Sequence, residues 1–269
     1  MRRPMFGAGG AAMLLAGVAM IVSAQGPPPR GPFGGRGAGG PMAGMFEFGG
    51  LMGGFGGKVV TGKPILASFT ITHSETLPGN TISNTTTGTF ARGADGSTYR
   101  DVKFTAMGPW AVSNKAQEIC YIRNVTKGEQ YIVNVTKGTY RAFPIREHNP
   151  ADAGKKKDRP NSNNETVVDN PNGTYTDPVT NVGYAVDDRK VTRTIPAGTI
   201  GNANAMIITS ERWRSTELDL LLEETHTDPR FGTTNYQLSN IGQSPAASLF
   251  TPDPSFTLVQ GGEFGPGSH

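Results

Sequence analysis

Cysteine is almost absent from this sequence: Cys120 is the only one in 269 residues. A single cysteine cannot form an intramolecular disulfide, so stability must come from packing. Ile119, Tyr121 and Ile122 surround it in a strand-like segment. We therefore expect Cys120 to be a small buried hydrophobe rather than a reactive thiol.

Motifs for catalysis, metal binding and phosphate binding are also missing. The four histidines form no H-E-x-x-H pattern, and there is no G-x-S-x-G nucleophile motif. The N-terminal glycines do not follow a strand and open a helix, as a phosphate-binding loop requires. His226-Thr227-Asp228 could supply two metal ligands from a turn, although a capped turn explains it as well. We therefore expect a protein that is not an enzyme and holds no metal or cofactor.

The net charge is small. Lys and Arg exceed Asp and Glu by +3, and two of these charges, Arg2 and Arg3, belong to a segment that we expect to be removed. The remaining chain then carries about +1. This balance argues against a nucleic-acid partner despite the pI of 9.0.

An apolar run near the N-terminus is too short to span a membrane. Arg2 and Arg3 precede the apolar residues 11–22, and Val22-Ser23-Ala24 suits cleavage by signal peptidase after Ala24. We predict a signal peptide over residues 1–24 and export to the periplasm or the cell exterior. No membrane-spanning segment is expected after cleavage. An uncleaved anchor is the alternative.

Residues 25–57 are rich in glycine and proline, with phenylalanine and methionine spaced along them. Glycine loses the most backbone entropy on ordering, so we predict a flexible arm. The aromatic and methionine content leaves other options open. The arm could dock on its own domain or on a neighbouring chain, form a short helix near residues 42–52, or donate a strand to another sheet.

From residue 59 onward the sequence alternates with a period of two, which is typical of half-buried strands. Ile65, Phe69 and Ile71 alternate with mostly polar residues, and Pro78-Gly79-Asn80 then turns the chain. Threonine suits a half-solvated pleated surface. No long helical stripe is present, so we predict one mainly β domain over residues 58–260. Its single large antiparallel meander sheet would be curved into a half-barrel or barrel, with little helix.

Several shorter features divide this domain. The sequence N-V-T-K-G occurs at 124–128 and again at 134–138, which predicts two similar turns with glycine at positive φ. Residues 146–180 are polar and contain three consecutive lysines, which predicts a long exposed loop. A last strand is expected over 248–259 and a disordered tail over 261–269.

The densest apolar segment, Ala205–Gly242, predicts three consecutive antiparallel strands that close the core. A one-residue slip in the first hairpin would lose its opposite-charge pairs, so the charges favour one register. A two-residue turn at Ser215-Thr216 would place Arg214 against Glu217, Arg212 against Asp219 and Trp213 against Leu218.

Glu211 breaks the apolar pattern, because this register puts it on the Trp213 face opposite Leu220. A carboxylate there must reach solvent, pair with an arginine such as Arg230, or have a raised pKa. A paired or rim-exposed glutamate is the simpler interpretation, since structural ion pairs also perturb pKa values.

The larger apolar side chains supply a candidate binding surface. A large curved sheet without a catalytic cluster can present a concave apolar face to a ligand. The alternative is that these side chains simply fill the core. The candidate ligand-lining residues are Phe69, Ile71, Tyr121, Tyr131, Glu211, Trp213, Leu220 and Tyr236.

Six short motifs stand out: T-I-P-A-G at 194–198, I-G-N at 200–202, E-R-W at 211–213, D-P-R-F-G at 228–232, Y-Q-L-S-N-I at 236–241 and S-L-F at 248–250. Together they resemble a family of uncharacterised exported β-rich bacterial proteins, over roughly residues 59–259. The chain is also similar, more distantly, to LolA-type half-barrels that carry lipoproteins or lipids across the periplasm. These resemblances imply a β-sheet carrier fold and transfer no functional residue.

We therefore expect an exported cell-envelope protein that binds an apolar ligand, a lipid or a protein partner on its curved sheet, without catalysis. The alternative is a structural or self-assembling surface protein that uses the arm over residues 25–57 for self-association.

Overall fold

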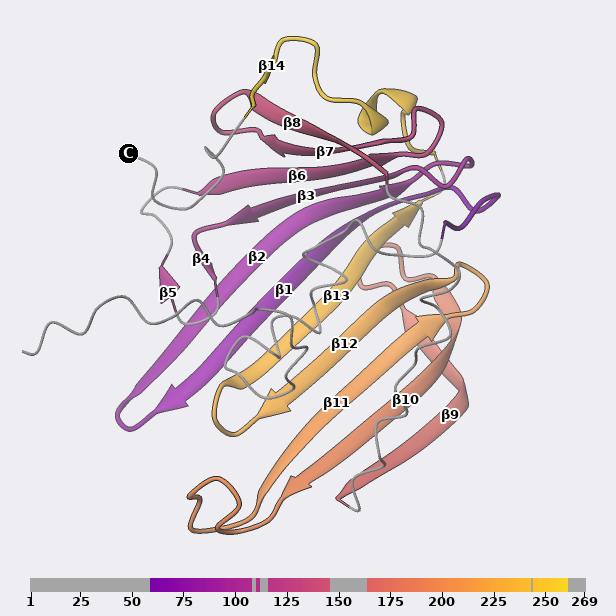
Figure 1. Ribbon diagram of the computed structural model, residues 1–269. Coiled ribbons are helices and arrows are strands. Elements are labelled where there is room, and N and C mark those ends of the chain that lie inside the picture. Colours follow the sequence, from indigo (N-terminus) through magenta and orange to yellow (C-terminus); the bar gives the residue numbers. More distant parts are fainter. Residues whose placement is uncertain (1–58, 108–109, 112–115, 146–163, 243, 261–269) are drawn as a thin grey trace, which may run out of the picture. The chain divides into compact units, whose positions relative to one another are not determined.

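The computed structural model of the chain describes residues 59–107, 110–111, 116–145, 164–242 and 244–260 (Figure 1). The predicted signal peptide, Gly/Pro-rich arm and C-terminal tail lie outside the described residues. Strands dominate the described ranges, and their single helix is η1, a four-residue 3-10 helix at Ala247–Phe250. No helix in these ranges is long and apolar enough to cross a membrane.

The first half of the described chain forms hairpins where the sequence predicts them. Pro78-Gly79 separates the first two long strands, and residues 93–97 separate the second from the third. The strands are β1 (Ile65–Leu77), β2 (Asn80–Arg92), β3 (Thr98–Phe104), β4 (Ala106–Met107), β5 (Trp110–Ala111), β6 (Gln117–Asn124), β7 (Glu129–Asn134) and β8 (Thr139–Pro144).

The second half contains the three consecutive strands predicted for Ala205–Gly242, preceded by another hairpin. The strands are β9 (Glu165–Thr176), β10 (Gly183–Ile195), β11 (Met206–Ser215), β12 (Leu220–Asp228), β13 (Gly232–Gly242) and β14 (Thr257–Leu258).

Twelve of these strands form one sheet, in the order β14-β8-β7-β6-β3-β2-β1-β13-β12-β11-β10-β9. All neighbours are antiparallel except β14 and β8. The sheet consists of two meanders, β1–β8 and β9–β13, which meet where β1 pairs with β13. In this pairing Ile71 lies opposite Tyr236. The sheet is not closed, because β9 and β14 are its edges (Figure 1). The predicted fold class, a single large antiparallel sheet with little helix, is confirmed.

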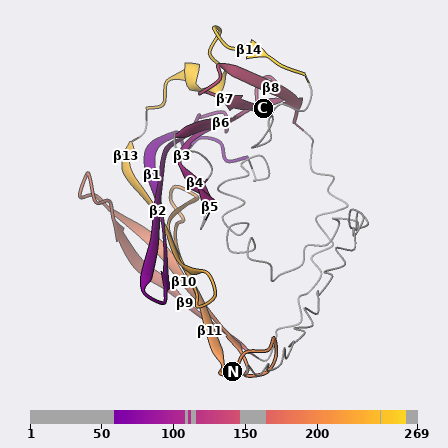
Figure 2. The ribbon, with the colours of Figure 1, turned by 90° about the vertical axis from the view of Figure 1, so that its left-hand side faces the viewer.

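The sheet is curved and has two distinct faces (Figure 2). Residues paired across neighbouring strands point to the same face, and residues adjacent in sequence point to opposite faces. The segment that contains η1 and β14 lies on the outer side of the curve. Phe256 in this segment packs against the cluster that contains Cys120 and Tyr131. We call this side the convex face. The register from strand to strand places Phe69 and Tyr236 on the opposite side, the concave face.

Two apolar clusters hold the sheet. The larger one includes Ile65, Leu222 and Leu238, which are fully buried, and each such side chain contributes about 1.5–3 kcal/mol relative to exposure. The smaller one surrounds Cys120, a buried free cysteine, as the sequence predicts. Burial raises the pKa of its thiol, aided by the charge of Asp101, so the group is neutral.

The repeated N-V-T-K-G sequence forms the same turn twice. In each copy the asparagine side chain accepts a hydrogen bond from the backbone N–H of the lysine, at 2.8 Å for Asn124 and 2.9 Å for Asn134. Gly128 and Gly138 have φ values of 67° and 63°. Both predicted turns are confirmed, because glycine alone adopts this backbone region without a Cβ penalty.

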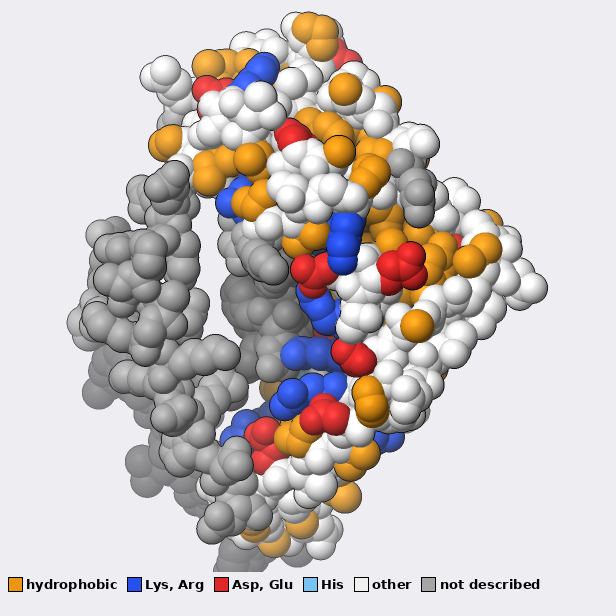
Figure 3. Space-filling view, turned by 90° about the vertical axis from the view of Figure 1, so that its right-hand side faces the viewer, with side chains coloured by type: hydrophobic (Ala, Val, Ile, Leu, Met, Phe, Trp, Pro, Cys, Tyr) orange, Lys and Arg blue, Asp and Glu red, His pale blue; other side chains and the backbone are white. Residues whose placement is uncertain are grey.

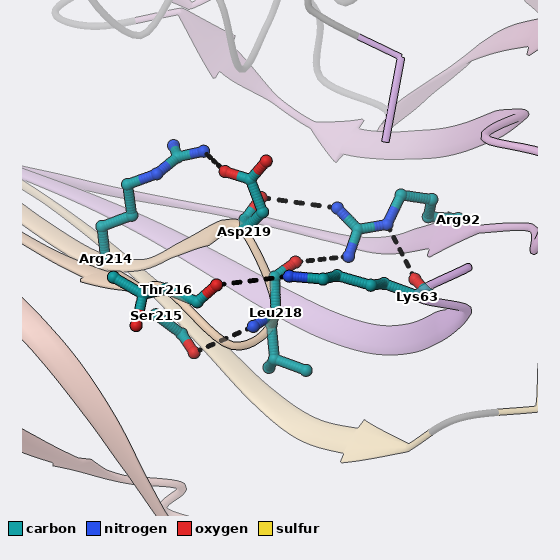
Figure 4. A network of polar contacts seen from close by, with 7 residues as sticks. All are labelled: Lys63, Arg92, Arg214, Ser215, Thr216, Leu218 and Asp219. Carbon is teal, nitrogen blue, oxygen red and sulfur yellow. Dashed lines mark hydrogen bonds and ion pairs between the residues drawn. The ribbon is translucent and has the colours of Figure 1, made fainter. Parts of the chain in front are cut away.

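Arg92 connects β2 to the β11–β12 turn, although two strands separate them in the sheet (Figure 4). Its buried guanidinium donates to the carbonyl oxygens of Lys63 at 2.8 Å, Leu218 at 2.5 Å and Asp219 at 3.4 Å. Burial lowers the pKa of Arg92, and the charge of Asp219 opposes this effect. Three carbonyls thus satisfy a buried cation while positioning Leu218 over the main cluster.

Part of the predicted polar loop is in fact a strand. Residues 146–163 of that loop lie outside the described residues, but 165–176 form the edge strand β9. Most of β9 is exposed on both faces, so its sequence has no period-two apolar signal, and pairing with β10 stabilises it. Pro171 lies at an irregularity in this pairing, between the partners of Val186 and Asp188, as expected for proline in an edge strand.

The predicted last strand over 248–259 is also wrong. Its first residues, 248–250, belong to the 3-10 helix η1. Within the predicted range, Thr257–Leu258 forms the strand β14, which pairs in parallel with β8. The prolines at 252 and 254 lack the N–H that a continuous ladder requires.

The predicted register of the β11–β12 hairpin is wrong as well. The turn covers residues 216–219 rather than two residues, and Asp219 has a φ of 46°, which aspartate tolerates better than most residues. A register shift between Trp213 and Arg214 adds a bulge, which the charge pattern could not reveal.

Both arginines of this hairpin nevertheless find carboxylates. Arg212 pairs with Glu224 at 2.7 Å, and Arg214 pairs with Asp219 inside the turn. Glu211 lies opposite Thr225 rather than Leu220. The opposite charges therefore correctly indicated that these arginines form ion pairs, but they did not identify the acidic partners.

Asp177 links the β9–β10 turn to the end of β13 through hydrogen bonds. Its fully buried carboxylate accepts hydrogen bonds from the N–H groups of Val179 (2.8 Å), Thr180 (3.2 Å), Asn240 (3.1 Å) and Ile241 (2.8 Å). Burial raises the pKa of Asp177, but the four donors lower it more, so its pKa lies below the ordinary value.

Gly232→Ala should destabilise the protein far more than Gly79→Ala. Both glycines have positive φ, but a Cβ at Gly232 would overlap the Ser74 carbonyl oxygen of β1, whereas Gly79 has open space. We expect a loss of about 1–2 kcal/mol for Gly79→Ala, from backbone strain alone. The loss for Gly232→Ala should exceed about 3 kcal/mol. Equal losses in urea unfolding would contradict the close approach of β1 and β13.

Asp177→Asn should lower the free energy of unfolding by about 1–3 kcal/mol at neutral pH, because buried N–H groups lose charged acceptors. The stability from Asp177 is fully present above its unfolded pKa of about 3.9 and is lost as pH falls through the lower folded pKa. The difference from wild type should therefore narrow in acid. Urea unfolding at several pH values measures this, with the exposed Asp187→Asn as control. A difference independent of pH would refute the assignment.

Candidate functional site

Four of the candidate ligand-lining residues come together on the concave face. Phe69 and Ile71 from β1 lie beside Leu238 and Tyr236 of β13, and the Phe69 and Tyr236 ring centroids are 5.9 Å apart. Tyr121 of β6 faces the same side and packs against this cluster. Alternating apolar residues on β1 and β13 thus build one apolar cluster from strands far apart in sequence. Phe69 and Tyr236 are buried in it, and Ile71 and Tyr121 are half-buried.

Gly88 makes room for the Phe69 ring. It lies opposite Phe69 on β2, and a Cβ at this position would stand 2.5 Å from Phe69 Cζ. The same Cβ would overlap the Asp101 backbone oxygen, so any larger residue would disturb the β3 backbone as well as the Phe69 ring.

Arg100 brings positive charge to the aromatic side chains. It lies on β3 between Phe90 and Tyr121, and its guanidinium carbon is 5.6 Å from the centre of the Phe90 ring. Burial lowers the pKa of Arg100, while the neighbouring Tyr236 and Tyr121 oppose this shift. Burial raises the pKa of Tyr236 to about 12, so this hydroxyl is a neutral donor beside the half-buried cation of Arg100.

A polar row borders the apolar surface on the same face. In register order it contains His73, Thr234, His226 and Ser210, from β1, β13, β12 and β11. The His73 Nδ1 atom is 3.0 Å from the Thr234 hydroxyl oxygen. The His73 Nε2 and His226 Nδ1 atoms are buried without a hydrogen-bond partner. A buried nitrogen without a hydrogen-bond partner lowers the stability of the fold. Such atoms therefore mark a place where a polar group of a ligand can bind.

Ser210 and His226 do not form a catalytic pair. They are neighbours across β11 and β12, but the Ser210 hydroxyl donates to Glu224 at 3.4 Å. Both oxygens of Asp228, which lies two residues from His226 along β12, accept hydrogen bonds from Arg230. Neither the hydroxyl nor the carboxylate is therefore directed at the imidazole, as a nucleophile-base-acid relay requires.

Three other candidate residues lie on the convex face. Tyr131 packs in the smaller cluster and donates its hydroxyl to Glu129. Glu211 pairs with Lys190 at 3.2 Å rather than with Arg230. Trp213 packs edge-on against Tyr175, with ring centroids 6.5 Å apart. The eighth candidate, Leu220, begins β12 and packs against the main cluster.

The carboxyl group with a raised pKa on this face is Asp188, not Glu211. Burial raises the pKa of Asp188, the charge of Glu211 adds to this effect, and a hydrogen bond from Trp213 and the charge of Lys190 oppose it. Asp188 lies opposite Trp213 across β10 and β11, which only the register could show. Figure 3 shows Lys and Arg side chains lying next to Asp and Glu side chains along one side of the sheet.

A separate pocket of about 460 Å³ lies where the β2–β3 and β6–β7 turns meet the C-terminal segment, with Asp95, Lys127 and Phe250 in its wall. Asp95 accepts hydrogen bonds from Ser97 and Thr126 and so serves to hold the two turns together. Within the described ranges, no group of three or more His, Cys, Asp or Glu residues could hold a metal ion.

Comparison with known proteins gives no family assignment. No protein-family model matches the chain, and no curated protein matches it. Several solved structures are similar at low sequence identity, and three of them illustrate the range.

A chain of the Pseudomonas aeruginosa MucA/MucB complex is 11% identical with a TM-score of 0.36, covering 73% of this chain and 58% of that one. An uncharacterised conserved protein from Thermus thermophilus is 9% identical with a TM-score of 0.36, covering 74% and 90%. A LolA superfamily protein from Nitrosomonas europaea is 8% identical with a TM-score of 0.27, covering 71% and 91%. A LolA superfamily protein is thus among the solved structures found, at a similarity that supports no conclusion about family or function.

Proposed function

We propose that this is an exported cell-envelope protein, located in the periplasm, whose concave sheet face binds an apolar ligand or lipid without catalysing a reaction. The observation that supports this is the gathering of Phe69, Ile71, Tyr121 and Tyr236 on one face of an open, curved sheet. Concave, mostly apolar surfaces with a few placed polar groups are typical ligand sites.

The polar groups on this face favour a ligand with a polar or anionic end. Arg100 supplies positive charge among the aromatic rings, and His73 and His226 each have a buried ring nitrogen without a hydrogen-bond partner. An acyl chain with a carboxylate end would contact the apolar cluster along its length. Its head would then reach the hydrogen-bonding groups of the neighbouring row.

The apolar cluster alone would also suit the apolar side chains of a protein partner. The orphaned imidazole nitrogens favour the small amphipathic ligand, because each needs a polar group delivered to a buried position.

Titration with the fluorescent fatty acid 11-(dansylamino)undecanoic acid tests this proposal. We expect the purified protein to enhance its fluorescence. Ile71→Trp should weaken binding by about tenfold, equivalent to about 1.4 kcal/mol, because the larger side chain occupies the half-buried space beside Tyr236.

The matched control is Ile207→Trp, since Ile207 lies on the convex face and is 56% exposed. It should leave the affinity unchanged within about twofold. Absence of any enhancement with the wild-type protein, or equal losses in both variants, would refute binding on the concave face.

A further inference from the structure

A continuous row of hydroxyl side chains crosses the convex face. Each member is the register partner of the next, and together they come from seven adjacent strands, β2, β1, β13, β12, β11, β10 and β9. In that order the members are Ser83, Ser74, Thr233, Thr227, Thr209, Thr192 and Thr166, which we call the hydroxyl row.

The hydroxyl row is regular and accessible. Adjacent strands lie about 4.8 Å apart, so the row presents one hydroxyl at each such step. Threonine is stiff about χ1, which fixes the direction of its hydroxyl. Ser74, Ser83 and Thr166 are exposed and the other members are half-buried. The hydroxyls of Thr227 and Thr233 lie 3.1 Å apart, within hydrogen-bond distance.

The row itself carries no charge. On the same face the next row begins with Thr85, Thr72 and Asn235, which are also uncharged register partners. Further along that row, Glu211 and Lys190 neutralise each other. A charged polymer would therefore find no complementary charge along the hydroxyl row, and an apolar ligand would find no apolar stripe there.

We propose that the hydroxyl row is a binding surface for a neutral polysaccharide chain. Hydroxyl groups both donate and accept hydrogen bonds, so a ladder of them matches the hydroxyls of sugar residues without any desolvated charge. The strand spacing is comparable with the rise of one sugar residue in an extended glycan. The row faces away from the concave cluster, so this inference does not depend on the proposed ligand site.

Affinity electrophoresis tests the inference, with the purified protein run in native gels that contain hydroxyethyl cellulose, dextran, laminarin or the anionic polymer alginate. We expect retardation by at least one of the three neutral polymers and none by alginate. The variant Thr209→Val/Thr227→Val/Thr233→Val keeps the β-branched shape but removes three hydroxyls. It should weaken the retardation about tenfold or more, because several hydrogen bonds are lost together.

The matched control, Thr180→Val/Thr199→Val/Thr216→Val, makes the same chemical change at exposed turn positions off the row. It should migrate like the wild type. Single Thr209→Val and Thr227→Val variants, each expected to lose about two- to threefold, keep the test valid if the triple variant unfolds. Lack of retardation by all three neutral polymers, retardation by alginate alone, or equal effects of the row and turn variants would overturn the inference.

Discussion

The pairing of β1 with β13 is the constraint on which the rest of the structure depends. It joins the meander β1–β8 to the meander β9–β13 through partners such as Ile71 and Tyr236, which are about 165 positions apart in sequence. Without it, each half would end in a long unpaired strand. Gly232 permits the close approach of the two strands. Arg92 of the first meander donates hydrogen bonds to the β11–β12 turn of the second. Pairings over such separations are slow to form, because the entropy of loop closure opposes them.

The same register gives the two faces different chemistry. On the concave face it aligns aromatic and aliphatic side chains with a half-buried arginine and a polar row that contains two histidines. On the convex face it aligns hydroxyl and amide side chains, with Glu211 and Lys190 paired beside them. A shift of a single residue would exchange the two sets, so every proposal about either face depends on this register.

Local signals in the sequence predict the elements better than their assembly. The alternation around Phe69 and the two N-V-T-K-G turns depend on neighbouring residues, and both are found as expected. Strand β9 was missed because its stability comes from β10 rather than from its own pattern. The candidate ligand-lining residues divide between faces because Tyr131 and Trp213 each depend on a register that the sequence does not state. The sequence did not predict that His73 and His226 share one row, because only folding brings them beside Thr234.

Strand β9 has a consequence for how copies of this protein behave when they are crowded. An open sheet offers its edge as a template for another strand, and β9 is a long, exposed edge with two partly exposed valines, Val167 and Val168. Pro171 divides this edge into the short stretches 165–170 and 172–176, because proline has no N–H to donate and sits at an irregularity. An incoming strand cannot form an unbroken ladder there. The edge therefore resists the edge-to-edge strand addition that leads to fibrils.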